Sequence, residues 1–158
     1  MNWRGSTDVK DRIFAALAYI LPLIVVLPFG QFMLRQFPIL GIIYLPLQPL
    51  ISLYYGLPLV GLIIFFVLFL AVVRNPKISH FVRFNTMQAI LLDILLVLCG
   101  LLLPILVQAL GVNLLTETLY NIVFLGILAA CGYSMVQSLM GRYAEIPSLS
   151  QAVYSQVP

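Results

Sequence analysis

The sequence predicts an all-α membrane protein that crosses the bilayer four times, and three observations lead to this fold class. Hydrophobic residues make up 63% of the 158 positions and charged residues only 8%, whereas an ordinary soluble domain carries about 25% charged residues. Four almost uncharged stretches are long enough to cross the bilayer as helices. All eight basic residues lie outside these stretches, most of them in the two tails and in one connection. We expect one membrane domain over residues 1–158, since nothing outside the spans could form a separate core.

The four expected spans cover residues 13–29, 57–73, 87–110 and 119–140. Each of the first two is an uncharged stretch that reaches about 26 Å as a helix, close to the roughly 30 Å of a bilayer core. The third span contains one carboxylate and the fourth contains no charge. The first span is also expected to kink, because Pro22 and Pro28 remove backbone hydrogen-bond donors from it.

A further apolar stretch, residues 39–55, lies between the first two spans and contains Pro46 and Pro49. Only Gly56 and Leu57 separate it from Pro58, and so short a connection cannot reverse the chain between two complete spans. We therefore expect a proline-broken interfacial or re-entrant segment here. A true fifth span is the alternative.

The distribution of charge predicts the orientation of the spans. Seven basic residues fall in the two tails and in the connection between spans two and three: Arg4, Lys10, Arg12, Arg74, Lys77, Arg83 and Arg142. The other two connections hold only Arg35. With four spans and both termini on one face, the positive-inside rule makes that face the cytoplasmic one. The polar start of the chain lacks the pattern of a cleavable presequence, so we expect the first span to be retained.

The connection before the third span is expected to be an interfacial helix over residues 76–86. Asn75 and Pro76 are a favourable N-cap and first helical residue. The apolar side chains of this helix would face lipid or neighbouring helices, while His80 and Arg83 would meet water and headgroups. The structural interpretation is a collar that anchors the third span.

Asp93 is the carboxylate of the third span and needs a partner. It lies about 9 Å inside the hydrocarbon if Met87 is the first residue there, where a carboxylate costs about 2.5–3.5 kcal/mol. Gln137 and Ser138 of the antiparallel fourth span have a similar expected depth. Small residues four apart in that span are expected to let the two helices approach closely; these are Gly126, Ala130 and Ser134. We expect Asp93 and Gln137 to join the helices, with a proton or ion relay as the alternative.

Other chemistry is sparse in the sequence. The only histidine, His80, has no cysteine or carboxylate at metal-ligand spacing, so no metal or other cofactor is expected. Cys99 and Cys131 are expected to be free buried thiols. No serine or cysteine has a visible base and orienting acid, so we expect no catalytic residues and no enzyme. The scattered basic residues form no stripe that would bind nucleic acid.

Two segments resemble a known family. The stretch HFVRFNTMQAILLDILL from residue 80 and the stretch EIPSLSQAV from residue 145 are similar to the Tic20 family, the twenty-kilodalton component of the translocon at the chloroplast inner envelope, with cyanobacterial and plastid-encoded relatives. The resemblance covers about residues 14–157. Gln151 departs from it, because an acidic residue is expected at this position.

The resemblance implies a four-helix subunit of a protein-import translocon, located in the chloroplast inner envelope or a cyanobacterial membrane. Its implied partners are other translocon subunits and precursor polypeptides. The chain would also contact the lipid bilayer, and it could assemble with further copies of itself. Four helices with so few polar residues cannot enclose a wide aqueous channel alone. The alternatives are a small ion or solute carrier with Asp93 as its titrating group, and a structural membrane assembly factor. The candidate interface or functional residues are His80, Arg83, Asn85, Gln88, Asp93, Gln137 and Glu145.

Overall fold

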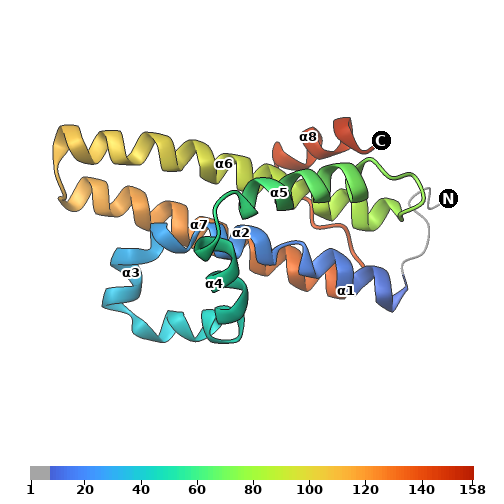
Figure 1. The fold of residues 1–158 in the computed structure, drawn as a ribbon, viewed down its shortest axis with the longest axis horizontal. Helices are drawn as coiled ribbons and strands as arrows, with labels where there is room; N and C mark the ends of the chain where they lie inside the picture. Colours follow the sequence, from blue (N-terminus) through green and yellow to red (C-terminus); the bar gives the residue numbers. More distant parts are fainter. Residues whose placement is uncertain (1–7) are drawn as a thin grey trace.

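Residues 8–158 are described in the computed structural model, and all regular structure within them is helical (Figure 1). The elements are α1 (Val9–Leu17), α2 (Ile20–Val25), η1 (Leu27–Gly30), α3 (Gln31–Gln36), η2 (Pro38–Leu47), α4 (Gln48–Gly56), α5 (Val60–Val67), η3 (Leu68–Val73), α6 (His80–Leu110), α7 (Leu114–Leu139) and α8 (Leu149–Gln156). Three helices are long and apolar enough to cross a membrane, or up to four if a bent pair counts as one span. The predicted class, an all-α polytopic membrane protein, is confirmed.

The two longest helices, α6 and α7, form an antiparallel hairpin that runs the length of the molecule (Figure 1). Gly111 ends α6 with a φ of 80°, a conformation that favours glycine, and its N–H donates to the carbonyl of Val107 at 2.7 Å. Asn113 then caps α7, because its side chain accepts from the N–H groups of Leu115 and Thr116. The Thr116 hydroxyl accepts from the Asn113 N–H at 2.9 Å. This capping box explains why the chain reverses within a few residues.

The buried seam of α7 follows a spacing of three and four residues, which is typical of antiparallel helices that pack at a shallow angle. Its buried residues from Phe124 onward are Phe124, Ile127, Cys131, Ser134 and Ser138. Gly126 lies off this seam, and nothing approaches within 4 Å of the place where its Cβ would be. The expected close approach at Gly126 was therefore wrong. Both cysteines are free, as predicted.

The first predicted span is helical but bent, as its prolines predict. The helices Val9–Val25 and Leu27–Gln36 meet at an angle of 56°. Pro28 has no N–H to donate to the carbonyl of Ile24, four residues earlier. The hydroxyl of Tyr55 on α4 donates to that carbonyl instead, at 2.8 Å. A side chain of the proline-rich segment thus satisfies a backbone group that the bend leaves open.

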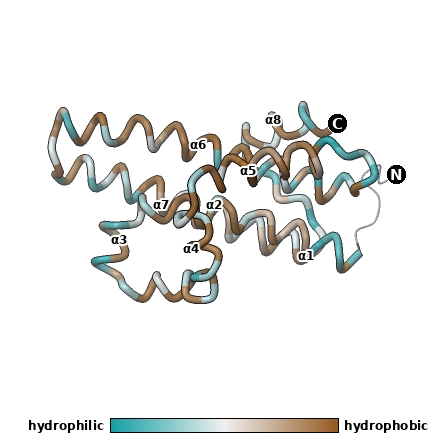
Figure 2. The backbone as a smooth tube through the Cα atoms, in the orientation of Figure 1, coloured by the Kyte–Doolittle hydropathy of each residue, from teal (hydrophilic) through white to brown (hydrophobic). Residues whose placement is uncertain are grey.

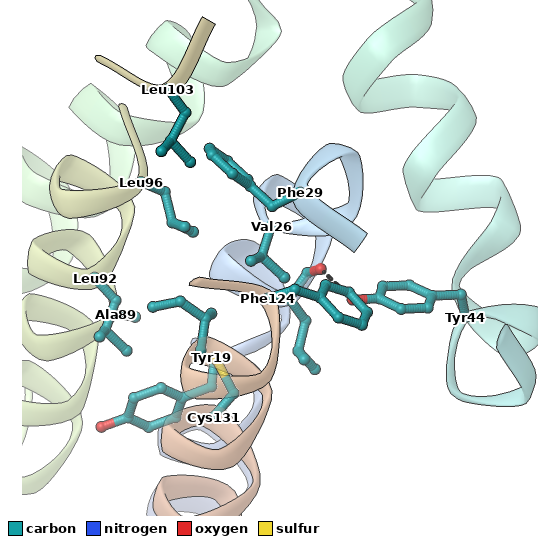
Figure 3. Packing of buried hydrophobic residues seen from close by; sticks show 12 residues of the cluster. Tyr19, Val26, Phe29, Tyr44, Ala89, Leu92, Leu96, Leu103, Phe124 and Cys131 are labelled. Atoms are coloured by element: carbon teal, nitrogen blue, oxygen red, sulfur yellow. Dashed lines mark hydrogen bonds between the residues drawn. The ribbon is translucent and has the colours of Figure 1, made fainter. Parts of the chain in front are cut away.

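A second tyrosine supports the same bend from η2. The hydroxyl of Tyr44 donates to the carbonyl of Leu23 at 2.9 Å, the dashed line in Figure 3. Tyr44 is buried together with Val26 and Phe29 of the bent segment. The two tyrosines explain why residues 38–56 return to the bundle after leaving it at α3 (Figure 1).

Tyr55→Phe should lower stability by about 1–2 kcal/mol, because it leaves the Ile24 carbonyl without a donor in apolar surroundings. The cost should shrink in a Pro28→Ala background, where the backbone regains its own donor. Thermal unfolding of the four variants in lipid nanodiscs measures both costs. Equal costs in the two backgrounds would show that the tyrosine does not act through this carbonyl.

The second predicted span is shorter than expected. It consists of 8 α-helical residues in α5 and 6 π-helical residues in η3, and it starts after Leu59, whose φ of 64° is left-handed. The preceding helical stretch, Pro38–Gly56, has 19 residues and passes the length and composition test for a span. The number of spans, and whether residues 38–56 enter the membrane, stay predictions.

The start of α6 corrects the predicted helix over residues 76–86. The N-cap is Ser79, whose hydroxyl accepts from the Val82 N–H at 3.3 Å. Asn75 instead accepts from the Lys77 N–H at 3.0 Å within a turn of its own. Residues 80–86 are therefore the first turns of α6, and most of them are buried against α1, η3 and α8. They are not a separate surface helix.

Polar residues gather at one end of the bundle (Figure 2). The start of α1, the connection between η3 and α6, and the segment after α7 lie at this end (Figure 1). These segments carry five of the basic residues: Lys10, Arg12, Arg74, Lys77 and Arg142. This agrees with the predicted charge asymmetry, while the side of the membrane that this end faces stays a prediction.

Candidate functional site

Gln88 is the centre of a buried polar network at the amino-terminal end of α6. Its side chain is completely buried. Its amide nitrogen donates to the hydroxyl of Tyr19 at 3.0 Å and to the carbonyl of Ala144 at 2.8 Å. Its oxygen accepts from the hydroxyl of Ser150 at 2.8 Å, and that hydroxyl accepts from the Ile146 N–H. One side chain of α6 therefore holds the first span and the carboxyl-terminal tail.

Asn85 lies one turn earlier on α6 and extends the network to α7. Its side-chain oxygen accepts from the hydroxyl of Tyr19 at 2.6 Å and from the hydroxyl of Ser138 at 3.1 Å. Its nitrogen donates to the carbonyl of Phe81 at 2.9 Å. Tyr19 thus donates to Asn85 and accepts from Gln88. All these groups are neutral, so the network can hold helices together but offers no acid or base.

His80 forms a second contact between α6 and the tail. Its Nε2 lies 2.9 Å from the carbonyl of Val157, which can only accept, so this nitrogen carries the hydrogen. Its Nδ1 lies 2.8 Å from the hydroxyl of Tyr143. The imidazole stacks on Tyr154 at 6.4 Å between ring centroids. The hydroxyl of Tyr154 donates to Glu145 at 2.8 Å, so two predicted residues, His80 and Glu145, meet in one cluster.

Arg83 connects α6 to the helix that precedes it. Its Nε donates to the carbonyl of Val73, the last residue of η3, at 2.8 Å. Val73 itself is buried against Phe84, Val153 of α8 and Val157, which follows α8. A basic side chain expected to meet water therefore makes an internal contact with the end of η3.

The predicted contact between Asp93 and Gln137 is not formed. Asp93 Oδ1 is buried and has no hydrogen-bond partner among the described residues, and Ser138 bonds Asn85 instead. Asp93 lies eight positions after Asn85, which rotates it by about 80° and moves it about 12 Å along the helix. It therefore lies at a different level and in a different direction on α6 from the contact between Asn85 and Ser138. In the described part of the chain, no group of three metal-ligating side chains is close enough to hold a metal ion.

Cysteine cross-linking tests this helix register. In a chain with Cys99 and Cys131 replaced by alanine, cysteines at Asn85 and Ser138 should cross-link in membranes, because the native side chains are in hydrogen-bond contact. Cysteines at Asp93 and Gln137 should not cross-link under the same oxidation. Cross-linking of Asp93 with Gln137 but not of Asn85 with Ser138 would support the pairing that was predicted from depth in the membrane.

Sequence reasoning missed several partners in this site. Tyr19, Tyr143 and Ser150 supply hydroxyls to the predicted residues. Tyr19 could have been suspected, because a tyrosine inside an apolar span needs a hydrogen-bond partner. Nothing local marks Ser150 or Tyr143, since their partners on α6 lie more than 60 positions away.

Known proteins match the chain over nearly its whole length. A family described as "Chloroplast import apparatus Tic20-like" matches residues 8–153. A "Tic20 family protein" of Synechocystis sp. is 58% identical, with 99% of each chain covered. "Protein TIC 20-II, chloroplastic" of Arabidopsis thaliana is 34% identical over 96% of this chain and 74% of its own length. The "Tic20 family protein Ycf60" of Gracilaria tenuistipitata is 36% identical over 97% of this chain and 78% of its own length. The chain therefore belongs to the Tic20 family.

Proposed function

We propose that this chain is a membrane subunit of a protein-import complex, in which it supports a path for polypeptides. Membership of the family of the chloroplast import apparatus supports this role. The observation that carries the finer proposal is the network of Asn85 and Gln88. Both side chains are completely buried and hold the tail and three helices in place. These residues of the family-like stretch act as scaffold, and contact with partners falls to other surfaces.

The surfaces proposed for partner subunits are the apolar faces in the outer half of the α6–α7 hairpin. Several large side chains there are exposed in the isolated chain: Leu101, Leu102, Ile105, Leu114 and Leu115. The core beneath them is filled by side chains such as Phe29, Leu96 and Phe124 (Figure 3). A polypeptide path would therefore be built between this chain and partner subunits or further copies. The end bearing the basic residues would face the stroma or cytoplasm.

Photo-cross-linking in membranes tests this role. A photoreactive residue at Leu102, which is 62% exposed, should capture another translocon subunit or a precursor arrested during import. The same residue at Phe84, which is 0% exposed, is the matched control and should capture neither. Capture of precursors or subunits at neither Leu102 nor Ile105 would contradict the proposal.

A small carrier that uses Asp93 is the second candidate function. The observation that favours it is the buried Oδ1 of Asp93 without a hydrogen-bond partner among the described residues. Under this alternative, Asp93→Asn abolishes transport and leaves assembly intact. Under the import role, the same change alters helix packing, and import falls only as far as assembly does.

A further inference from the structure

A groove of about 440 Å³ lies beside the first span, between α1, α2, α4, α5, η3 and α6. Nearly all of its lining is apolar, from residues such as Leu21, Leu53 and Ile64. The side-chain hydroxyls in the lining belong to Tyr54 and Thr86. The volume falls in the range of about 300–1,000 Å³ that is usual for sites of small ligands. The groove can therefore take a compact hydrocarbon body.

Asp93 does not line the groove itself but follows its α6 lining residues on the same face of that helix. Val82 and Thr86 are the α6 residues that line the groove. Asp93 follows Thr86 by seven positions, which places it about 10 Å further along the helix and within about 20° of the same direction. Tyr54 and Tyr55 of α4 are near enough to Asp93 to interact with its charge, and Tyr54 itself lines the groove. The helix geometry and the two tyrosines of α4 therefore both place Asp93 close to the groove.

The carboxylate of Asp93 is well suited to pair with a cation. The residue is only 7% exposed, and its Oδ1 has no hydrogen-bond partner among residues 8–158. A buried carboxylate is costly unless a positive charge or several donors accompany it. A neutral hydrocarbon would fill the groove and leave this oxygen unpaired, and an anion would be repelled by it.

We propose that the groove binds a lipophilic cation, a ligand with one positive charge on a compact hydrocarbon body. The hydrocarbon lies against α2, α4 and α5, and the charge lies toward Asp93. This site is separate from the buried network of Gln88, and the proposal does not depend on a role in import.

Calorimetric titration of the full chain in lipid nanodiscs tests the site, with empty nanodiscs as the blank. Tetraphenylphosphonium should bind saturably, and tetraphenylborate, which has the same shape and the opposite charge, should not. Asp93→Asn should weaken binding of the cation at least tenfold. Glu117→Gln removes the same charge in the first turn of α7 and should leave the affinity unchanged.

A variant that fills the groove separates its shape from its charge. Ile64→Trp keeps Asp93 and should also weaken binding at least tenfold, because the indole occupies the groove. Equal binding of the cation and the anion, or undiminished binding in Asp93→Asn, would overturn the proposal. If Asp93→Asn does not fold, the comparison of the two ions and the Ile64→Trp variant decide the question.

Discussion

Gln88→Leu is expected to release the carboxyl-terminal tail from α6 and to lower the free energy of unfolding by about 3–5 kcal/mol. The change removes hydrogen bonds to the Tyr19 hydroxyl, the Ala144 carbonyl and the Ser150 hydroxyl. A buried polar group left without its partner costs about 1–3 kcal/mol, and leucine can replace none of these bonds. Thermal unfolding in nanodiscs measures the stability, and amide hydrogen exchange of residues 144–157 measures the release of the tail.

Gln108→Leu is the matched control, because it makes the same change at an exposed position of the same helix. It should leave both the unfolding temperature and the exchange of the tail unchanged. If Gln88→Leu leaves the tail as protected as in the native chain, the contacts of α8 with α6 hold it without the network. The apolar residues Val153 and Val157 would then carry the docking.

The long helices and the bend could be predicted from the sequence, but the helices between them could not. The long stretches with almost no charged residues predicted α6 and α7, and Pro28 predicted the bend in the first span. Prolines also suggested a broken segment over residues 39–55. In the structure, Pro49 lies in the first turn of α4, where a missing N–H costs little, and Pro46 lies inside η2 close to its end at Leu47. One of the two prolines begins a helix, and the pattern alone does not distinguish this role from that of a helix breaker.

The candidate site was predicted in its residue types but not in its pairs. His80, Asn85, Gln88 and Glu145 all take part in the polar contacts that dock the tail or join the helices. The partners could not be named, because depth in a bilayer does not determine how two helices are rotated about their axes. The predicted contact of Asp93 with Gln137 is absent for this reason, since the α6 residue that bonds α7 near Gln137 is Asn85, whose direction on α6 differs from that of Asp93 by about 80°.

Phe124→Ala is expected to lower stability by about 3 kcal/mol, and Gly30→Ala by about 1–3 kcal/mol. Phe124 is completely buried beside the bend of the first span, and a Cβ on Gly30 would collide with its ring. The ring thus fills the space that the glycine leaves. Because lipid is as apolar as the protein interior, the loss in Phe124→Ala comes from packing. This places its cost at the lower end of the usual range for removing a phenylalanine.

The two changes should not add. With Phe124 truncated, the methyl group of Gly30→Ala enters the cavity, so the double variant should be more stable than the sum of the single changes predicts by about 1–3 kcal/mol. Gly126→Ala is the control, since nothing lies within 4 Å of that position, and its small effect should not depend on Phe124. Thermal unfolding of the single and double variants measures the coupling. Additivity within about 0.5 kcal/mol would show that α7 does not pack against Gly30, and the bend of the first span would then depend on Tyr44 and Tyr55 alone.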